Sequence, residues 1–128
     1  MTNLTLVERF YSAVSQGDSE TIRQSLSPDI EWVQTEGFPN GKTYQGIGAY
    51  FEELFPMFSQ EWNQWRSDVH EYCDAGEKII ALGYYSGIYK RTNKETRASF
   101  AHVLTLESGK IVKFVQYTDT IKIIEAMH

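Results

Sequence analysis

The C-terminal half of the chain constrains the fold most, because it alternates four strand-like segments with three short turns. The segments are rich in β-branched and aromatic residues, and the last two alternate apolar with polar side chains. The turns, DAGE, RTNK and ESGK, consist of turn-forming residues. This pattern predicts consecutive antiparallel strands over residues 61–73, 78–90, 95–106 and 110–118.

The start of the chain has helical patterns instead. Thr5 and Glu8 have the spacing of a capping box, and apolar residues then recur at helical intervals. Asp18 is a natural N-cap for a second helix, and only a glycine turn separates the two. We therefore expect a helical hairpin.

The middle of the chain predicts one early strand and a third helix. Residues 30–36 have strand composition, and residues 47–58 form the clearest amphipathic helix, with apolar side chains at i, i+3, i+4 and i+7. Pro56 lacks a backbone donor, so this helix should end or kink near Phe55. Residues 119–128 fit either a last helical turn or an added strand.

These elements predict an α+β fold: a curved antiparallel sheet with three helices of the N-terminal half closing one face. The length, 128 residues, fits a single domain spanning 1–128. Aromatic residues make up 14% of the chain. This is more ring surface than a small core requires, so the rings either line a cavity or fill a wide core.

Charge and hydropathy exclude several classes of partner. The net charge is −5 and no cluster of Lys and Arg occurs, so we expect neither nucleic acid nor an anionic membrane as a partner. No segment approaches the roughly 18 apolar residues of a membrane span, and the N-terminus lacks the pattern of a secretory signal. We expect a cytoplasmic protein.

Metal and thiol chemistry are not indicated either. Cys73 is the only cysteine, so no intrachain disulfide or thiolate cluster can form. The three histidines, His70, His102 and His128, have no metal-ligand spacing. We therefore predict no metal site.

Two polar residues stand out in the predicted sheet, His102 and Asp119. If residues 97–106 form one strand, His102 shares a face with Phe100 and Leu104 and lies among apolar neighbours. Such a histidine is either a core residue with satisfied hydrogen bonds or a functional group. The next strand should place Val112, Phe114, Gln116 and Thr118 on one face.

Asp119 leaves three alternatives. A buried carboxylate needs a partner or a raised pKa. It could instead cap a short helix over residues 120–126. It could also pair with His102 and fix the tautomer of the imidazole.

The segments SPDIEWV and FAHVLTLESGKIVKFVQYTDT resemble those of SnoaL-like proteins, which belong to the nuclear transport factor 2-like, or ketosteroid isomerase-like, superfamily. The similarity runs over nearly the whole chain. It implies a cone-shaped fold in which a bent sheet wraps an apolar pocket, and a homodimer that pairs through the sheet. Members include isomerases, polyketide cyclases, dehydratases and pure binding proteins, so the fold alone assigns no reaction.

Ketosteroid isomerase activity is not expected. Its helical tyrosine corresponds to Phe10, its general base to a position at or near Gln34, and its late-strand acid to His102. All three chemical groups are therefore replaced. The cyclase-like branch is closer, because its enzymes resemble cofactor-free acid/base catalysts with a pocket histidine and a late aspartate. This resemblance implies catalytic roles for His102 and Asp119, with Asp119 orienting His102 or serving as a second acid/base group.

The function we expect is cofactor-free isomerisation, cyclisation or dehydration of an apolar, ketone-bearing small molecule. The alternative is a non-catalytic binding domain for an apolar metabolite. A third reading, a protein-interaction module, does not require an inward-facing histidine. The expected pocket wall comprises Trp32, Phe38, Phe55, Phe100 and Tyr117.

Overall fold

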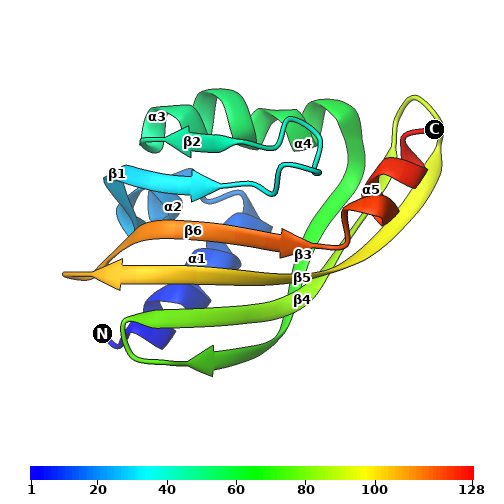
Figure 1. The fold of residues 1–128 in the computed structure, drawn as a ribbon. Helices are drawn as coiled ribbons and strands as arrows, with labels where there is room; N and C mark the ends of the chain where they lie inside the picture. The colour runs from blue at the N-terminus through cyan, green and yellow to red at the C-terminus, as the bar shows by residue number, and fades with distance from the viewer.

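A computed structural model describes all residues, 1–128. Its centre is one six-stranded sheet with the strand order β2-β1-β6-β5-β4-β3. The long strands bend, and the N-terminal helices lie behind the sheet in the view of Figure 1. This α+β architecture confirms the predicted fold class. No helix is long and apolar enough to cross a bilayer.

The helical hairpin consists of α1 (Asn3–Gln16) and α2 (Ser19–Ser25). The predicted capping box is wrong, because α1 begins earlier and the side chain of Thr2 accepts the backbone N–H of Thr5 at 3.1 Å. Gly17 ends α1 in the left-handed conformation that glycine adopts without strain. Asp18 caps α2 as predicted, and its Oδ1 accepts the N–H of Thr21 at 3.2 Å.

The third helical segment runs through α3 (Ile47–Ala49), a π-helical stretch η1 (Tyr50–Leu54) and α4 (Phe55–Glu61). The sequence predicted that this helix ends or kinks near Phe55. The structure has an irregularity there, but it is a π-helical stretch. The helix widens before Pro56, where the N–H of Phe55 bonds to the carbonyl five residues earlier. Pro56 then lies in the first turn of α4, where a missing backbone donor is tolerated.

The predicted four-stranded meander is confirmed, and β1 lies parallel to β6 with β2 as a short edge strand. The C-terminal segment is the helix α5 (Thr120–Ala126), which settles the alternative of an added strand. The strands are β1 (Leu26–Val33), β2 (Thr43–Gln45), β3 (Trp62–Asp74), β4 (Lys78–Tyr89), β5 (Lys94–Glu107) and β6 (Lys110–Thr118).

One expectation about strand faces is wrong. Val112 does not share a face with Phe114, because a bulge inserts one extra residue into β6. Leu106 pairs with Ile111 and Thr105 with Lys113, which leaves Val112 unpaired between them. Ile111 and Phe114 are consequently the buried residues of this part of β6.

The concave face of the sheet is buried under the helices. On β5 the buried side chains alternate with half-buried ones, so Phe100, His102 and Leu104 all face inward, as predicted. Their apolar surroundings continue into α1 through Phe10 and into β6 through Phe114. The imidazole therefore projects from the centre of the sheet toward the helices.

Candidate functional site

A cavity of about 780 Å³ lies between the sheet and the helices. Its walls come from α1, β1, the η1–α4 stretch and the first half of β3, and His102, Tyr85 and Phe114 of the sheet line it. Exposed polar residues of β3, among them Asn63 and Arg66, also line it and mark its opening to solvent. The wall is rich in aromatic rings, including Phe10, Trp32, Tyr50, Phe55, Phe58 and Trp65.

His102 is the central polar group of this cavity. Its Nδ1 lies 2.6 Å from the hydroxyl of Tyr11 on α1, and its Nε2 lies 2.6 Å from the hydroxyl of Tyr85 on β4. The ring of Phe100 stacks on the imidazole, with centroids 3.9 Å apart. Both ring nitrogens thus bond to phenols. We call Tyr11, His102 and Tyr85 the Tyr–His–Tyr bridge.

A second layer of polar groups supports the bridge. Gln116 on β6 is 1% exposed, and its Nε2 donates to the hydroxyl of Tyr85 at 2.9 Å. Its Oε1 accepts the backbone N–H of Thr35 at 3.1 Å, and the Thr35 hydroxyl donates to the Gln116 carbonyl at 2.6 Å. These bonds join the segment after β1 to β6. They fix Gln116 rigidly, and through it Tyr85.

Burial sets the protonation states of the bridge. Removal from water lowers the pKa of His102 well below its ordinary value, because the charged imidazolium is the form that loses hydration. The same desolvation raises the pKa of Tyr11 and of Tyr85. At neutral pH the bridge is therefore a neutral imidazole between two neutral phenols.

Gln34, which aligns with the base of ketosteroid isomerase, lines the cavity. It is 3% exposed, and its Oε1 accepts the indole N–H of Trp32 at 2.9 Å. The carboxylate among the lining residues is Asp68, near the opening, where it pairs with Arg66 at 3.0 Å. The enclosed part of the cavity consequently presents neutral hydrogen-bonding groups.

Three of the residues proposed from the sequence, His102, Trp32 and Phe55, line the cavity. Phe100 does not line it, because its ring is covered by the imidazole it stacks on and by Tyr85. Phe38 does not line it either and packs in a second apolar cluster beside Tyr85, with ring centroids 6.1 Å apart. Both support the bridge from outside the cavity.

Tyr117 and Asp119 are not brought to the cavity. Tyr117 alternates with the inward Gln116 and is 58% exposed on the opposite face. Asp119 is exposed and takes the N-cap position of α5, although its side chain makes no capping bond. The expectation that Asp119 orients His102 is therefore wrong, because tyrosines occupy both ring nitrogens.

The residues missed from the sequence are Tyr11, Tyr85 and Gln116. Tyr11 follows Phe10, and both line the cavity, so the hydroxyl absent at Phe10 is supplied one position later. A signal for Tyr11 existed, since it lies four residues after Val7 on the apolar stripe of α1. Tyr85 could not be identified without the register between β4 and β5, which sets Ala81 opposite His102.

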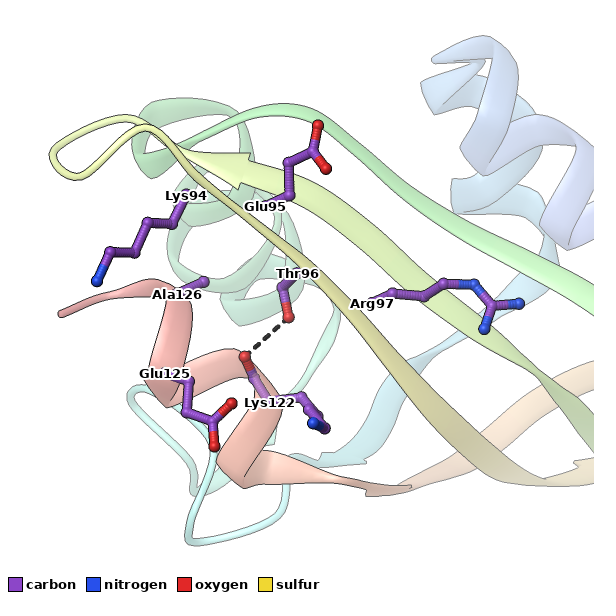
Figure 2. A pocket seen from close by; sticks show the side chains of 7 residues that line it. All are labelled: Lys94, Glu95, Thr96, Arg97, Lys122, Glu125 and Ala126. Atoms are coloured by element: carbon purple, nitrogen blue, oxygen red, sulfur yellow. Dashed lines mark hydrogen bonds between the residues drawn. The ribbon is translucent and has the colours of Figure 1, made fainter.

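A second hollow, of about 580 Å³, lies between β5 and α5. Figure 2 shows charged side chains of both signs around it, and the Thr96 hydroxyl donates to the Lys122 carbonyl at 2.9 Å. It is lined by one apolar residue, Ala126. The enclosed cavity around His102 is therefore the candidate site for an apolar ligand.

Comparison with known proteins agrees with the fold. The sequence model of the SnoaL-like domain matches residues 7–114. A nuclear transport factor 2-like protein from Burkholderia thailandensis is 34% identical, with a TM-score of 0.96 over 100% of this chain and 98% of that one. No curated protein matches the sequence significantly.

Two more distant structures share the fold. TerC, co-crystallised with polyporic acid, is 23% identical, with a TM-score of 0.88 over 98% of this chain and 97% of that one. A SnoaL-like polyketide cyclase homologue from Jannaschia is 14% identical, with a TM-score of 0.82 over 97% of this chain and 90% of that one.

Proposed function

We propose a function from the premise that the chain belongs to the SnoaL-like family: it is a cofactor-independent enzyme acting on an apolar, carbonyl-bearing small molecule. The reaction classes are isomerisation, cyclisation or dehydration through an enolate. The observation that supports this most is a neutral imidazole held between two phenols at the wall of an enclosed aromatic cavity. Few packing roles require three polar groups at such a place.

One phenol of the bridge would act on the carbonyl oxygen. A tyrosine hydroxyl donates a hydrogen bond to the oxygen, and this bond strengthens as the negative charge of an enolate develops there. The hydroxyls of Tyr11 and Tyr85 lie on buried residues among aromatic rings, so the bond is stronger than in solution. The raised pKa of each buried phenol keeps its hydrogen in place for donation.

His102 would receive the proton taken from carbon. The C–H bond next to the carbonyl breaks and its electron pair enters the enolate. The proton passes to a phenol oxygen while the hydrogen of that phenol moves to the imidazole. Return of the proton to another carbon gives an isomer. Attack of the enolate carbon on a second carbonyl gives a ring, and the new alkoxide takes the proton from the imidazolium. Expulsion of a β-hydroxyl, which takes the same proton and leaves as water, gives an alkene.

The low pKa of His102 limits the substrate. A weakly basic imidazole removes a proton efficiently only from an acidic C–H group. We therefore expect the hydrogen to lie next to two carbonyls, or between a carbonyl and a double bond. The aromatic wall selects an apolar body for the same molecule.

The test is exchange of carbon-bound hydrogen. The wild-type protein, H102Q and H102A are incubated in D₂O with a panel of cyclic ketones and diketones, and deuterium uptake and products are followed by NMR. The wild type should accelerate exchange, and both variants should lose about 10²-fold or more. Undiminished exchange in both variants would remove His102 from the mechanism.

A second candidate function is non-catalytic binding of an apolar metabolite. It is favoured by the amide of Gln34, which replaces a basic carboxylate, and by the weak basicity of His102. Under this function the bridge only donates a hydrogen bond. A ketone that raises the unfolding temperature, with neither exchange nor product after long incubation, would support it.

We also propose a homodimer that pairs through the outer face of the sheet. Val103 and Val115 are paired, half-buried residues of this face, and the exposed Tyr117 lies beside them. Covering them in a second copy would remove apolar surface from water. Sedimentation analysis should give a dimer for the wild type and a monomer for Y117K. A wild-type monomer at high concentration would contradict the proposal.

A further inference from the structure

The donor and the acceptor of each hydrogen bond behind the cavity can be assigned, starting from Gln116. The backbone N–H of Thr35 can only donate, so its partner on Gln116 is the amide oxygen, at 3.1 Å. The NH₂ group of Gln116 must then point to Tyr85, 2.9 Å away. Tyr85 therefore accepts a hydrogen bond from Gln116.

This acceptance decides where the hydrogen of Tyr85 goes. Its oxygen has two protein partners, Gln116 and the Nε2 of His102. With the first bond accepted, donation of its single hydrogen to Nε2 satisfies both partners. The opposite arrangement makes the oxygen accept twice and leaves its hydrogen without a protein acceptor on a residue that is 4% exposed.

The remaining steps follow from the neutral imidazole. When Nε2 accepts, the ring hydrogen is on Nδ1, which then donates to the Tyr11 oxygen at 2.6 Å. The hydroxyl of Tyr11 has no second protein partner, and Tyr11 lines the cavity. Within the Tyr–His–Tyr bridge, its hydrogen is the one left for a ligand.

We propose that Thr35, Gln116, Tyr85, His102 and Tyr11 form a single directed chain of hydrogen bonds, in which Tyr11 is the residue that donates to the ligand and Gln116 is a positioning residue that sets the direction. The inference deepens the proposed function, and it rests on that function only for the nature of the ligand. Each donor in such a chain polarises the next, so Tyr11 becomes a stronger donor than an isolated phenol.

The chain also defines the ligand group. Tyr11 offers a hydrogen, and the NH₂ of Gln34 makes no bond to the protein while Gln34 lines the same cavity. Two donors without protein acceptors match an oxygen with two lone pairs, as in a ketone or an enolate.

The direction can be measured without any ligand or turnover. Nitrogen-15 NMR of the histidine rings distinguishes a protonated nitrogen from an unprotonated one. In the wild type at neutral pH, His102 should carry its hydrogen on Nδ1. A hydrogen on Nε2, or on both nitrogens, would overturn the chain, whatever the catalytic assays give.

The Q116E variant should reverse the chain. The introduced carboxylate accepts from both Thr35 and Tyr85, so Tyr85 must in turn accept from Nε2 and the ring hydrogen moves there. Buried glutamates reach pKa values of about 8–9, so the spectrum is recorded near pH 9.5. A hydrogen that stays on Nδ1 in Q116E would show that Gln116 does not set the direction. If Q116E does not fold, the wild-type spectrum still decides.

A ligand experiment separates the two tyrosines. The probe is 2-tetralone labelled with carbon-13 at the carbonyl, whose signal moves downfield when the oxygen accepts a hydrogen bond. Y11F should abolish most of this shift, whereas Y85F should retain most of it. The reverse order would overturn the role of Tyr11. No binding of the ketone to the wild type would count against the proposed function, and the ring spectra alone would then decide the chain.

Discussion

Tyr11 and His102 are 91 positions apart in the chain, yet their polar atoms lie 2.6 Å from each other at the wall of the cavity. The contact joins the first helix to the middle of the sheet, and Tyr85 completes it from the other side of the imidazole. Every element that carries a member of this bridge must be docked before the bridge can form. The proposed function and the stability of the fold therefore involve the same three side chains.

Removal of the imidazole should destabilise the fold. H102A leaves the hydroxyls of Tyr11 and Tyr85 without their common partner and opens a void beside Phe100. We expect a loss of about 3–5 kcal/mol in the free energy of unfolding, measured by urea denaturation. H102Q, which keeps a donor and an acceptor, should lose less than H102A. Equal losses would show that the hydrogen bonds contribute little.

Stability should fall in mild acid because of the buried imidazole. The folded pKa of His102 is below the unfolded value of about 6.5, so the unfolded chain binds the proton more readily. The groups facing the ring, Tyr11 and Tyr85, stay neutral in this range. The stabilisation is complete above about pH 6.5 and is lost as the pH falls toward the folded pKa.

The measurement is the urea midpoint as a function of pH between about 4.5 and 7.5. The slope in this range should be smaller in H102Q, because that side chain does not titrate. His70 and His128 are exposed in the fold and remain in both proteins, so they serve as internal controls. Identical slopes in the two proteins would mean that His102 titrates alike in the folded and unfolded states.

Filling the cavity should block binding without changing the bridge. Val14 lies on α1, is half-buried and lines the cavity, so V14W places an indole in the space for the ligand. We expect a more than tenfold loss of affinity for cyclic ketones, measured by calorimetry. V14A is the matched control and should bind at least as well as the wild type. Equal affinity in V14W would place the ligand elsewhere.

Close approach of β3 to β4 explains one glycine. A Cβ at Gly83 would lie 2.0 Å from the carbonyl oxygen of Asp68 and 2.8 Å from the ring of Phe100. G83A should therefore cost more than about 2 kcal/mol of stability. At Gly48, within a helix, a Cβ meets no atom within 4 Å, and G48A should be neutral or stabilising by up to about 1 kcal/mol. Comparable stability of the two variants, by thermal unfolding, would contradict the packing of β3 on β4.

The sequence predicted the fold correctly where apolar residues recur with one regular spacing, that of a strand or of a helix. The alternation in β5 placed His102 inward, and the turns ESGK and RTNK set the meander. Irregularities were less accessible. The bulge at Val112 and the π-helical stretch before Pro56 each insert one residue. The spacing of apolar side chains along the sequence does not predict such an insertion.

The site was predictable only in part, because a hydrogen-bond network depends on distances between elements. Periodicity identifies His102 as inward, but its partners come from α1 and β4 and depend on docking and register. Asp119 was assigned by its place near the end of the chain. The turn into α5 carries it away from the cavity.

The most direct test of the buried bridge is an NMR pH titration of the His102 ring. The ring of His102 should still be neutral at and below about pH 6.5, where an unperturbed imidazole gains its proton, because burial lowers its pKa well below that value. A His102 ring that gains its proton at about pH 6.5, like an imidazole in water, would contradict the burial of this imidazole between two phenols.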